Sequence, residues 1–361
     1  MVWKKAIRVE ESSVVVYGTS QERWLKYVVR AAAISFAVKI YLALTTYGTN
    51  DVLSWELFLT INRLHGGMGL YYKVEQFNHP PFVIHLLSFL GSLRELILIP
   101  FPFWLRLPAI FADVAAVILV WKLLIIADLP KRDPWALFFM ALCPTSIMTS
   151  GFHGNTDPVM ICLVLLSVYL IEKNASPWLA GIAMGFAINV KVVPVILLPA
   201  ILLYLPNNNK RAYFLLATVT TFVITSLPYI MEDPFFILVR VFGYSSISGQ
   251  WEVSWIFNLL VPQLTSSSTL LLINSGKIVV MAAILAVSLW MNRGCHRPAL
   301  FVQLGFVMFI FMSLAPGFGI QYLAWLVPWV VGHGTTITIM YYSVSGLFQF
   351  LVYNFWSGFR R

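Results

Sequence analysis

The amino-acid sequence predicts an all-α fold, a polytopic transmembrane helical bundle of about 10–12 spans with interfacial amphipathic helices in its first outer loop. Of the 361 residues, 59% are hydrophobic and only 11% are charged, whereas a soluble domain carries about 25% charged residues. The apolar runs are long, and a bilayer-spanning helix needs about 20 mostly apolar residues. Most runs do not alternate, which favours helices over the strands of a barrel.

Charge and cysteine usage narrow the class further. The net charge is +9, but the basic residues form short clusters between apolar runs, which is the pattern of the positive-inside rule and gives no indication of nucleic-acid binding. Cys143, Cys162 and Cys295 are scattered and show neither a disulfide framework nor zinc spacing. Residues 1–20 lack a long apolar core, so we expect no cleavable signal peptide and an uncleaved signal-anchor instead.

The first part of the chain is expected to cross the membrane once and then stay outside. Residues 1–25 are polar and basic and are expected to form a cytoplasmic tail, followed by a span at about 26–46. Residues 47–103 mix charged, apolar and turn-forming residues, so we interpret them as one outer loop with helices in the membrane interface.

The segment 51–65 illustrates this interfacial pattern. Asn50 is expected to cap the helix, with Asp51 at the positive end of its dipole, and a second amphipathic helix is expected to start at Pro80-Pro81. One face of 51–65 is apolar and another polar; the apolar positions are Leu53, Leu57, Ile61 and Leu64, and the polar ones are Glu56, Thr60 and Arg63.

The rest of the chain reads as alternating spans in a single domain, 1–361. Gly181 and Gly185 form a GxxxG step, which predicts close helix packing, and the short runs near 177–206 leave open a hairpin that does not cross completely. The charge rule is met by all basic loops except the terminal Arg360-Arg361. The expected spans are roughly 104–125, 135–150, 158–171, 177–190, 192–206, 212–231, 270–291, 298–315, 318–332 and 335–352, and the expected inner clusters are Lys131-Arg132, Lys173, Lys210-Arg211 and Arg293/Arg297.

Asp51 is the first candidate for a catalytic group. It follows a span directly and starts an amphipathic helix, so it is expected at the depth of the lipid headgroups. A carboxylate in that position can take a proton from an attacking hydroxyl. A helix cap explains the same residue about equally well, and Glu56, five residues later, is the rival base.

Two further polar segments are candidates for ligand contacts. His153, Asn155 and Asp157 lie in a glycine-containing stretch between two spans, where an ordinary turn with Asp157 as cap is the alternative. His79 precedes Pro80-Pro81 and is suited to bind phosphate or sugar, although it equally suits a helix start.

The remaining candidates are cations and aromatic residues. Arg106 and Asp113 share a helix face, and a structural link through Lys39 is the favoured interpretation over catalysis. Lys191 and Arg240 are placed to meet a lipid phosphate or to reach water. Tryptophan side chains stack on sugars but are also enriched at membrane interfaces; those in question are Trp251, Trp255 and Trp325.

Several stretches, in order, resemble the GT-C superfamily of polytopic glycosyltransferases. The first outer loop reads Thr49-Asn50-Asp51, then Gly69-Leu70-Tyr71-Tyr72, then Asn78-His79-Pro80-Pro81, and similar acidic and Pro-Pro motifs are typical of that group. The segment Arg106 to Asp113 resembles its Arg-to-Asp segment. The likeness extends to three later stretches: Ser150 to Pro158, Asn189-Val190-Lys191, and Pro316-Gly317 followed by Gln321-Tyr322.

The resemblance covers about residues 25–330 and implies an inverting glycosyltransferase with Asp51 as general base. It implies a hexose, mannose or glucose, moved from a polyprenyl-phosphate donor to a glycan or lipid-linked acceptor at the outer or lumenal face of a cell or endoplasmic reticulum membrane. No metal site or cofactor is expected, because Asp51 has no paired carboxylate. The expected substrate contacts are Glu56, His79, Arg106, His153, Asn155, Asp157, Lys191, Arg240 and Gln321. A transporter or lipid flippase is the alternative, although it would show charged mid-bilayer sites and repeats.

Overall fold

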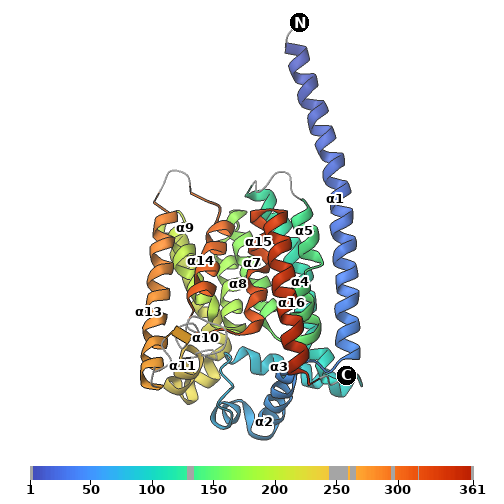
Figure 1. Ribbon diagram of the computed structural model, residues 1–361. Coiled ribbons are helices and arrows are strands. Elements are labelled where there is room, and N and C mark those ends of the chain that lie inside the picture. The colour runs from blue at the N-terminus through green and yellow to red at the C-terminus, as the bar shows by residue number, and fades with distance from the viewer. Residues whose placement is uncertain are drawn as a thin grey trace.

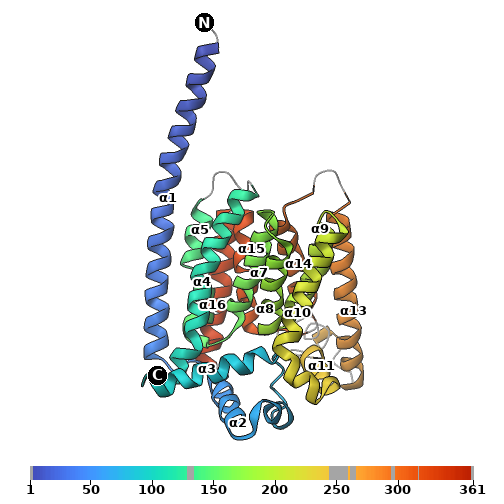
Figure 2. The ribbon, with the colours of Figure 1, turned by 180° about the vertical axis from the view of Figure 1, so that it is seen from behind.

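The computed structural model describes residues 3–127, 134–243, 259–260, 266–293, 297–315 and 317–358, with side chains described from residue 24 onward except at 266–274. Throughout these ranges the regular structure is helical, so the expected all-α fold is confirmed. The elements are α1 (Trp3–Thr45), α2 (Asn50–Lys73), α3 (Phe82–Leu96), α4 (Phe101–Ile126), α5 (Pro134–Ala141), α6 (Pro144–Ser146), the π-helix η1 (Ile147–His153), α7 (Asp157–Glu172), α8 (Pro177–Val190), η2 (Val193–Leu197), α9 (Leu198–Tyr204), α10 (Asn208–Glu232), α11 (Pro234–Phe242), α13 (Ser266–Met291), α14 (Leu300–Leu314), η3 (Ile320–Tyr322), α15 (Leu323–Val330), η4 (Val331–His333) and α16 (Thr335–Trp356). Apart from α2 and α3, the longer helices lie side by side in one bundle, beyond which the first part of α1 extends (Figures 1 and 2).

Many of these helices are apolar enough for a bilayer. In the described part of the chain, five segments have the length and composition of a membrane span. They are Trp24–Thr45, Phe101–Ile126, Pro134–His153, Asn208–Glu232 and Thr335–Trp356, and four shorter apolar helices accompany them: Pro177–Val190, Val193–Tyr204, Ser275–Met291 and Leu300–Leu314. The bounds follow the expected runs closely, but length and composition alone identify fewer spans than the 10–12 expected.

The hairpin at 177–204 extends along the whole of α7. At one end Lys191, just after α8, pairs with Asp157 at the start of α7. At the other end Tyr204, the last residue of α9, donates a hydrogen bond to Glu172 at the end of α7. The short runs therefore reach as far along the bundle as α7 does, and whether they cross the membrane completely stays a prediction.

The two ends of the bundle differ in charge. Arg297 binds the last carbonyls of α9, and Arg211 binds the carbonyl of Leu205, so Lys173, Lys210-Arg211 and Arg293/Arg297 gather at one end. Lys131-Arg132 and Arg360-Arg361 lie outside the described residues. Helices α2 and α3 cover the opposite end, where α16 also finishes (Figures 1 and 2).

Helix α2 has the expected amphipathic pattern, with two differences from expectation. Thr49, rather than Asn50, is the N-cap, because its hydroxyl accepts a hydrogen bond from the Asp51 amide. The helix also continues past residue 65 to Lys73, through a kink at Gly66, whose φ of 71° suits glycine. The side chains of Leu53, Leu57 and Leu64 are exposed on the predicted apolar face, while Trp55, Phe58 and Leu59 pack inward.

The GxxxG step brings α8 against α10. A Cβ added at Gly185 would lie 2.6 Å from Thr221 Cβ and 2.8 Å from the Thr218 carbonyl oxygen. A Cβ at Gly181 would lie 2.4 Å from the Phe214 carbonyl oxygen. The predicted close packing is confirmed, and it lets Thr218 donate a hydrogen bond to the Gly181 carbonyl.

We therefore expect Gly185→Ala to lower the melting temperature of the purified protein in detergent. The added methyl group must push α8 and α10 apart, at a typical overpacking cost of about 1–3 kcal/mol. Gly332→Ala is the matched control, because a Cβ there meets only Phe301 Cε1 at 3.4 Å, an ordinary contact. Equal melting temperatures for the two variants would contradict the close packing.

Candidate active site

The centre of the candidate site is a contact between Asp51 and His153. His153 Nε2 lies 3.2 Å from Asp51 Oδ2, and His153 Nδ1 lies 2.7 Å from the Thr49 hydroxyl oxygen. That hydroxyl oxygen already accepts a hydrogen bond from the Asp51 amide, so the hydroxyl hydrogen is available to Nδ1. In the tautomer that satisfies these contacts, Nε2 carries the hydrogen and faces the carboxylate.

The burial of the two side chains is very different. His153 is fully buried, and its ring stacks on Tyr353 of α16 with 4.4 Å between ring centroids. The Asp51 side chain is 36% exposed. The buried histidine therefore lies against one carboxylate oxygen, while the carboxyl group stays accessible at the end of the bundle.

The local backbone explains how His153 reaches Asp51. The chain enters this region as the π-helix η1, and Gly154 ends it with a left-handed φ of 81°, a conformation that suits glycine. A Cβ at Gly151 would lie 3.0 Å from Lys39 Cα, so η1 packs directly on the backbone of α1. π-Turns are frequent at functional sites, because they re-aim side chains within a helix.

The electrostatic environment keeps Asp51 ionised. Burial by itself raises the pKa of this carboxyl, but the adjacent His153, followed by the ammonium of Lys191, outweighs burial and holds the pKa below its usual value. Asp51 is therefore a carboxylate at neutral pH.

A second ion pair stands beside the first. Lys191 Nζ lies 2.7 Å from Asp157 Oδ1, and Asp157 has no exposed surface. The ammonium also lies over two rings, 4.9 Å from the centroid of Tyr322 and 5.0 Å from that of Trp325. The Asn155 side chain accepts the Asp157 amide, so Asn155 orders the loop from which the pair is built.

His79 completes the group of polar residues near Asp51. Its ring packs on Trp55 with 4.9 Å between centroids, and Tyr71 donates a hydrogen bond to its carbonyl. Burial, followed by the charge of Lys191, lowers the pKa of His79 to about 3, against a hydrogen bond to Val190 and the Asp51 charge. The imidazole is therefore neutral at physiological pH.

Three segments far apart in the sequence meet here. The first outer loop touches the 151–158 loop through Asp51 and His153. The 317–322 segment borders both, since Ile320 packs with Phe152 and Tyr353, and Tyr322 lies over Lys191. Within that segment Gln321 is half-buried, next to the ring that covers Lys191. Pro316 lies outside the described residues.

Other expected contact residues lie farther from this centre. Glu56 accepts a hydrogen bond of 2.7 Å from Tyr47. Arg240, on α11, donates to the carbonyls of Tyr71 and Glu75 and so ties α11 to the first outer loop. Of the three tryptophans, Trp325 lies beside Lys191, while Trp251 and Trp255 lie outside the described residues.

Arg106 has the geometry of a helix cap. It is fully buried and donates to backbone carbonyls at the end of α1 and just after it, among them those of Thr46 and Tyr47. The last carbonyls of a helix lack partners within the helix, so this guanidinium satisfies them.

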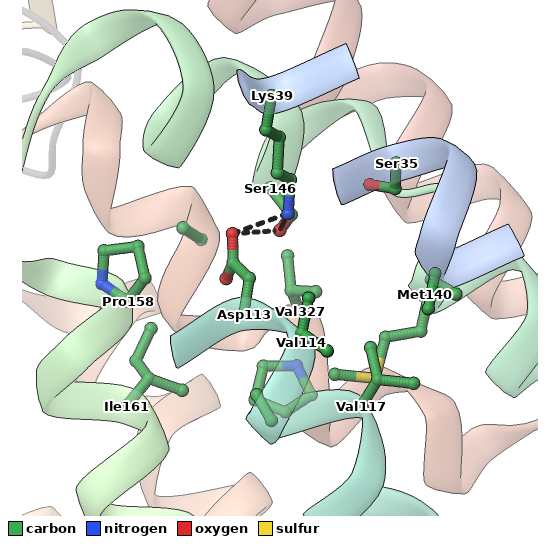
Figure 3. Close-up of a pocket in the computed structure, with 15 residues that line it drawn as sticks. Ser35, Lys39, Asp113, Val114, Val117, Met140, Ser146, Pro158, Ile161 and Val327 are labelled. Carbon is green, nitrogen blue, oxygen red and sulfur yellow. Dashed lines mark hydrogen bonds and ion pairs between the residues drawn. The ribbon is translucent and has the colours of Figure 1, made fainter. Parts of the chain in front are cut away.

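The expected Lys39 link reaches Asp113 but not Arg106. Lys39 Nζ lies 2.7 Å from Asp113 Oδ2 and 2.9 Å from the Ser146 hydroxyl, which in turn donates to Asp113 at 2.7 Å (Figure 3). The three groups line a cavity of about 20 Å³, enough for a single water. Because Ser146 immediately precedes η1, this cluster fixes the start of the π-helix that ends at His153.

Sequence reasoning did not single out Tyr353, Thr49 or Ser146 as contact residues of this assembly. Tyr353 lies in an apolar terminal helix, and its stacking on His153 joins residues 200 positions apart in the chain. A single threonine before a predicted cap, and a single serine within a span, carry no distinguishing pattern.

In the described ranges no three His, Cys, Asp or Glu side chains gather closely enough to hold a metal ion. The expectation that no metal is required stays a prediction.

Comparison with known proteins identifies the family. The profile of glycosyltransferase family 87 matches residues 77–317, well over half of the chain. The match includes His79, His153, Asp157 and Lys191, whereas Asp51 precedes it.

Curated relatives agree with this match at low identity. The chain is 25% identical over 131 residues to "GPI mannosyltransferase 1" of Candida albicans, a stretch that covers 32% of this chain and 33% of that protein. It is 31% identical over 115 residues to the protein of the same name from Schizosaccharomyces pombe, covering 32% of this chain and 30% of that one. The matched stretches span about a third of these relatives. The expected likeness to GT-C glycosyltransferases is thus confirmed over the transporter alternative, and the chain belongs to glycosyltransferase family 87 as a membrane glycosyltransferase.

Proposed function

We propose that the protein transfers a hexose from a polyprenyl-phosphate-linked donor to a glycan or lipid-linked acceptor, with inversion, at the outer or lumenal face of its membrane. Mannose is favoured over glucose, because the curated relatives are named as mannosyltransferases. The observation that carries the proposal is the ionised, partly exposed Asp51, held by buried His153 beside the cation Lys191.

The proposed reaction assigns a role to each charge. The acceptor hydroxyl oxygen attacks the anomeric carbon, the bond from that carbon to the phosphate oxygen breaks, and Asp51 takes the hydroxyl proton. The phosphate leaves with the bonding electrons, from the face of the sugar opposite the attack, which is why the transfer inverts. With its low pKa, Asp51 accepts the proton only as the attacking oxygen acquires positive charge during bond formation.

Lys191 and His79 are proposed to bind the donor. Lys191 has three ammonium hydrogens, and Asp157 occupies one, so the others can bind the donor phosphate and the charge that develops on it. Neutral His79 forms a hydrogen bond with the Val190 backbone. Its second ring nitrogen can therefore accept a hydrogen bond from a sugar hydroxyl. Glu56, Asn155, Arg240 and Gln321 remain proposed sugar or acceptor contacts, and buried Arg106 would act through the backbone that it holds.

Asp51→Asn is expected to lower sugar transfer about 10²–10⁴-fold while donor affinity changes little. The amide has nearly the shape of the carboxylate, and Thr49 still caps the helix, but an amide cannot accept the proton. Turnover and donor binding of purified protein in nanodiscs provide the two measurements.

Glu56→Gln is the matched control on the same helix. Five residues from Asp51, it points about 140° away by the helical period, and its contact is with Tyr47. We expect kcat to stay close to wild type and only the acceptor KM to rise, because Glu56 is proposed as a substrate contact and not as the base. Loss in the Glu56 variant with normal turnover in the Asp51 variant would transfer the base to Glu56.

A double-mutant cycle tests the Lys191–Asp157 pair. Either single variant, Lys191→Met or Asp157→Asn, leaves a buried charge without its partner and is expected to destabilise the protein by about 3–5 kcal/mol. The double variant should recover part of that stability, measured by denaturant unfolding.

Activity in the same cycle separates folding from donor binding. Lys191→Met and the double variant should both raise the donor KM, because both lack the cation, although only the single variant is strongly destabilised. A double variant with wild-type donor KM would exclude Lys191 as the phosphate ligand.

The proposed membrane face follows from loop charges. Single cysteines at two exposed positions, Glu75→Cys near α2 and Asn209→Cys at the start of α10, sample the opposite ends of the bundle in a cysteine-free background. We expect an impermeant thiol reagent to label residue 75 from the outside of intact cells or of right-side-out membrane vesicles. Residue 209 should be labelled only after permeabilisation. The reverse pattern would place the candidate site on the cytoplasmic face.

A further inference from the structure

A groove lies between the kink of α2 and the end of α10, away from Asp51. It has a volume of about 430 Å³ and an open mouth. Its lining residues are His65, Gly66, Gly67, Met68, Gly69, Tyr72, Pro228, Tyr229 and Glu232. Nothing in the transfer mechanism above uses these side chains.

The glycines of this segment shape the groove. Gly66 has φ 71° and ψ 174°, so the chain reverses where other residues would be strained. A Cβ on Gly67 would lie 2.5 Å from Tyr229 Cε1, which means that the tyrosine packs directly against the backbone of the turn. The sequence His65-Gly66-Gly67-Met68-Gly69 is thus required to bring α2 and α10 together around the groove.

The chemistry of the lining favours a neutral polyol. Tyr72 is 51% exposed and Tyr229 is half-buried, so both offer ring surface against which a sugar ring can pack, while Glu232 and His65 offer hydrogen-bonding groups at the rim. The described lining contains one carboxylate and no lysine or arginine. A phosphate would find no cation here and would be repelled by Glu232.

The groove is joined to the candidate site through Tyr71. The hydroxyl of Tyr71 donates to the carbonyl of His79, and its ring lies edge-on to Tyr229, 6.2 Å between centroids. Along α2, His65 is fourteen residues from Asp51, about 21 Å at the helical rise. That separation is too large for the sugar that reacts at Asp51, but suits a sugar farther along the same acceptor.

We propose that this groove is a distal acceptor subsite, which binds a neutral sugar of the acceptor glycan several residues from the hydroxyl that attacks. Tyr72 and Tyr229 stack on the sugar, and Glu232 accepts hydrogen bonds from its hydroxyls. The assignment rests on the proposed glycosyl transfer for the identity of the ligand as acceptor. The groove's affinity for neutral sugars can nevertheless be measured without any transfer.

The test is binding of neutral and charged sugars to the full-length protein in nanodiscs, with no donor present. The probes are mannotriose, maltotriose and glucose 6-phosphate, titrated by calorimetry. We expect saturable binding of at least one trisaccharide and weaker binding of the phosphate ester. Glu232→Gln should raise the trisaccharide Kd about tenfold, the equivalent of one hydrogen bond to a charged group. Tyr72→Ala removes the stacking ring and should raise the Kd by about the same factor.

Two control variants define the site. Glu95→Gln removes an exposed carboxylate on α3 that pairs with Arg63 and should leave the Kd unchanged. Asp51→Asn should also leave it unchanged, since the groove is distal. Trisaccharide binding that fails in wild type, survives both groove variants, or is exceeded by glucose 6-phosphate would overturn the subsite. If the groove binds sugars but wild type transfers none, the proposed function fails, and the groove stands as a sugar-binding site without the acceptor role.

Discussion

The contact between Asp51 and His153 is the interaction that positions the candidate catalytic carboxylate. It joins the first residues of α2 to the last residue of the π-helix, two segments about a hundred positions apart in the chain. Thr49 contacts both partners, since its hydroxyl bonds to the imidazole of His153 and accepts a hydrogen bond from the Asp51 amide, and Tyr353 stacks on the imidazole. The result is a carboxylate that is ionised, oriented and still open on one side.

An apolar bundle constrains where such groups can lie. Charges are costly in a low-dielectric interior unless they are paired, and the described polar groups near the site obey this rule. Lys191 pairs with Asp157, Lys39 pairs with Asp113 and Ser146, and Arg106 caps the carbonyls at the end of α1. These pairs cross between α1, α4, α7 and the segment after α8, so they position the backbone from which the site is built.

The sequence predicted the fold much better than it predicted the site. The helix bounds follow from the lengths of the apolar runs, and the close packing at Gly181 and Gly185 follows from the small size of glycine. Both are local properties, which do not depend on how the helices are arranged. Asp51, His79, His153 and Lys191 were also predictable as candidates, because charged residues are rare in this chain. Their pairing could not be predicted, since it depends on long-range contacts. Arg106 was expected to contact substrate, although its neighbours are backbone carbonyls at the end of α1. Thr49 is the helix cap in place of the expected Asn50, because its hydroxyl bonds to both Asp51 and His153. The contact with His153 cannot be predicted from the local sequence.

The proposed mechanism requires that a lipid-linked donor gives up its sugar beside Asp51. The most direct measurement is incubation of the purified protein with radiolabelled polyprenyl-phosphate mannose, polyprenyl-phosphate glucose and the corresponding nucleotide sugars, in the presence of membrane-extracted acceptors, with nuclear magnetic resonance of the product's anomeric linkage. We expect transfer from a polyprenyl-phosphate sugar alone, with an anomeric configuration opposite to that of the donor. Transfer from nucleotide sugars only, or retention of configuration, would contradict it.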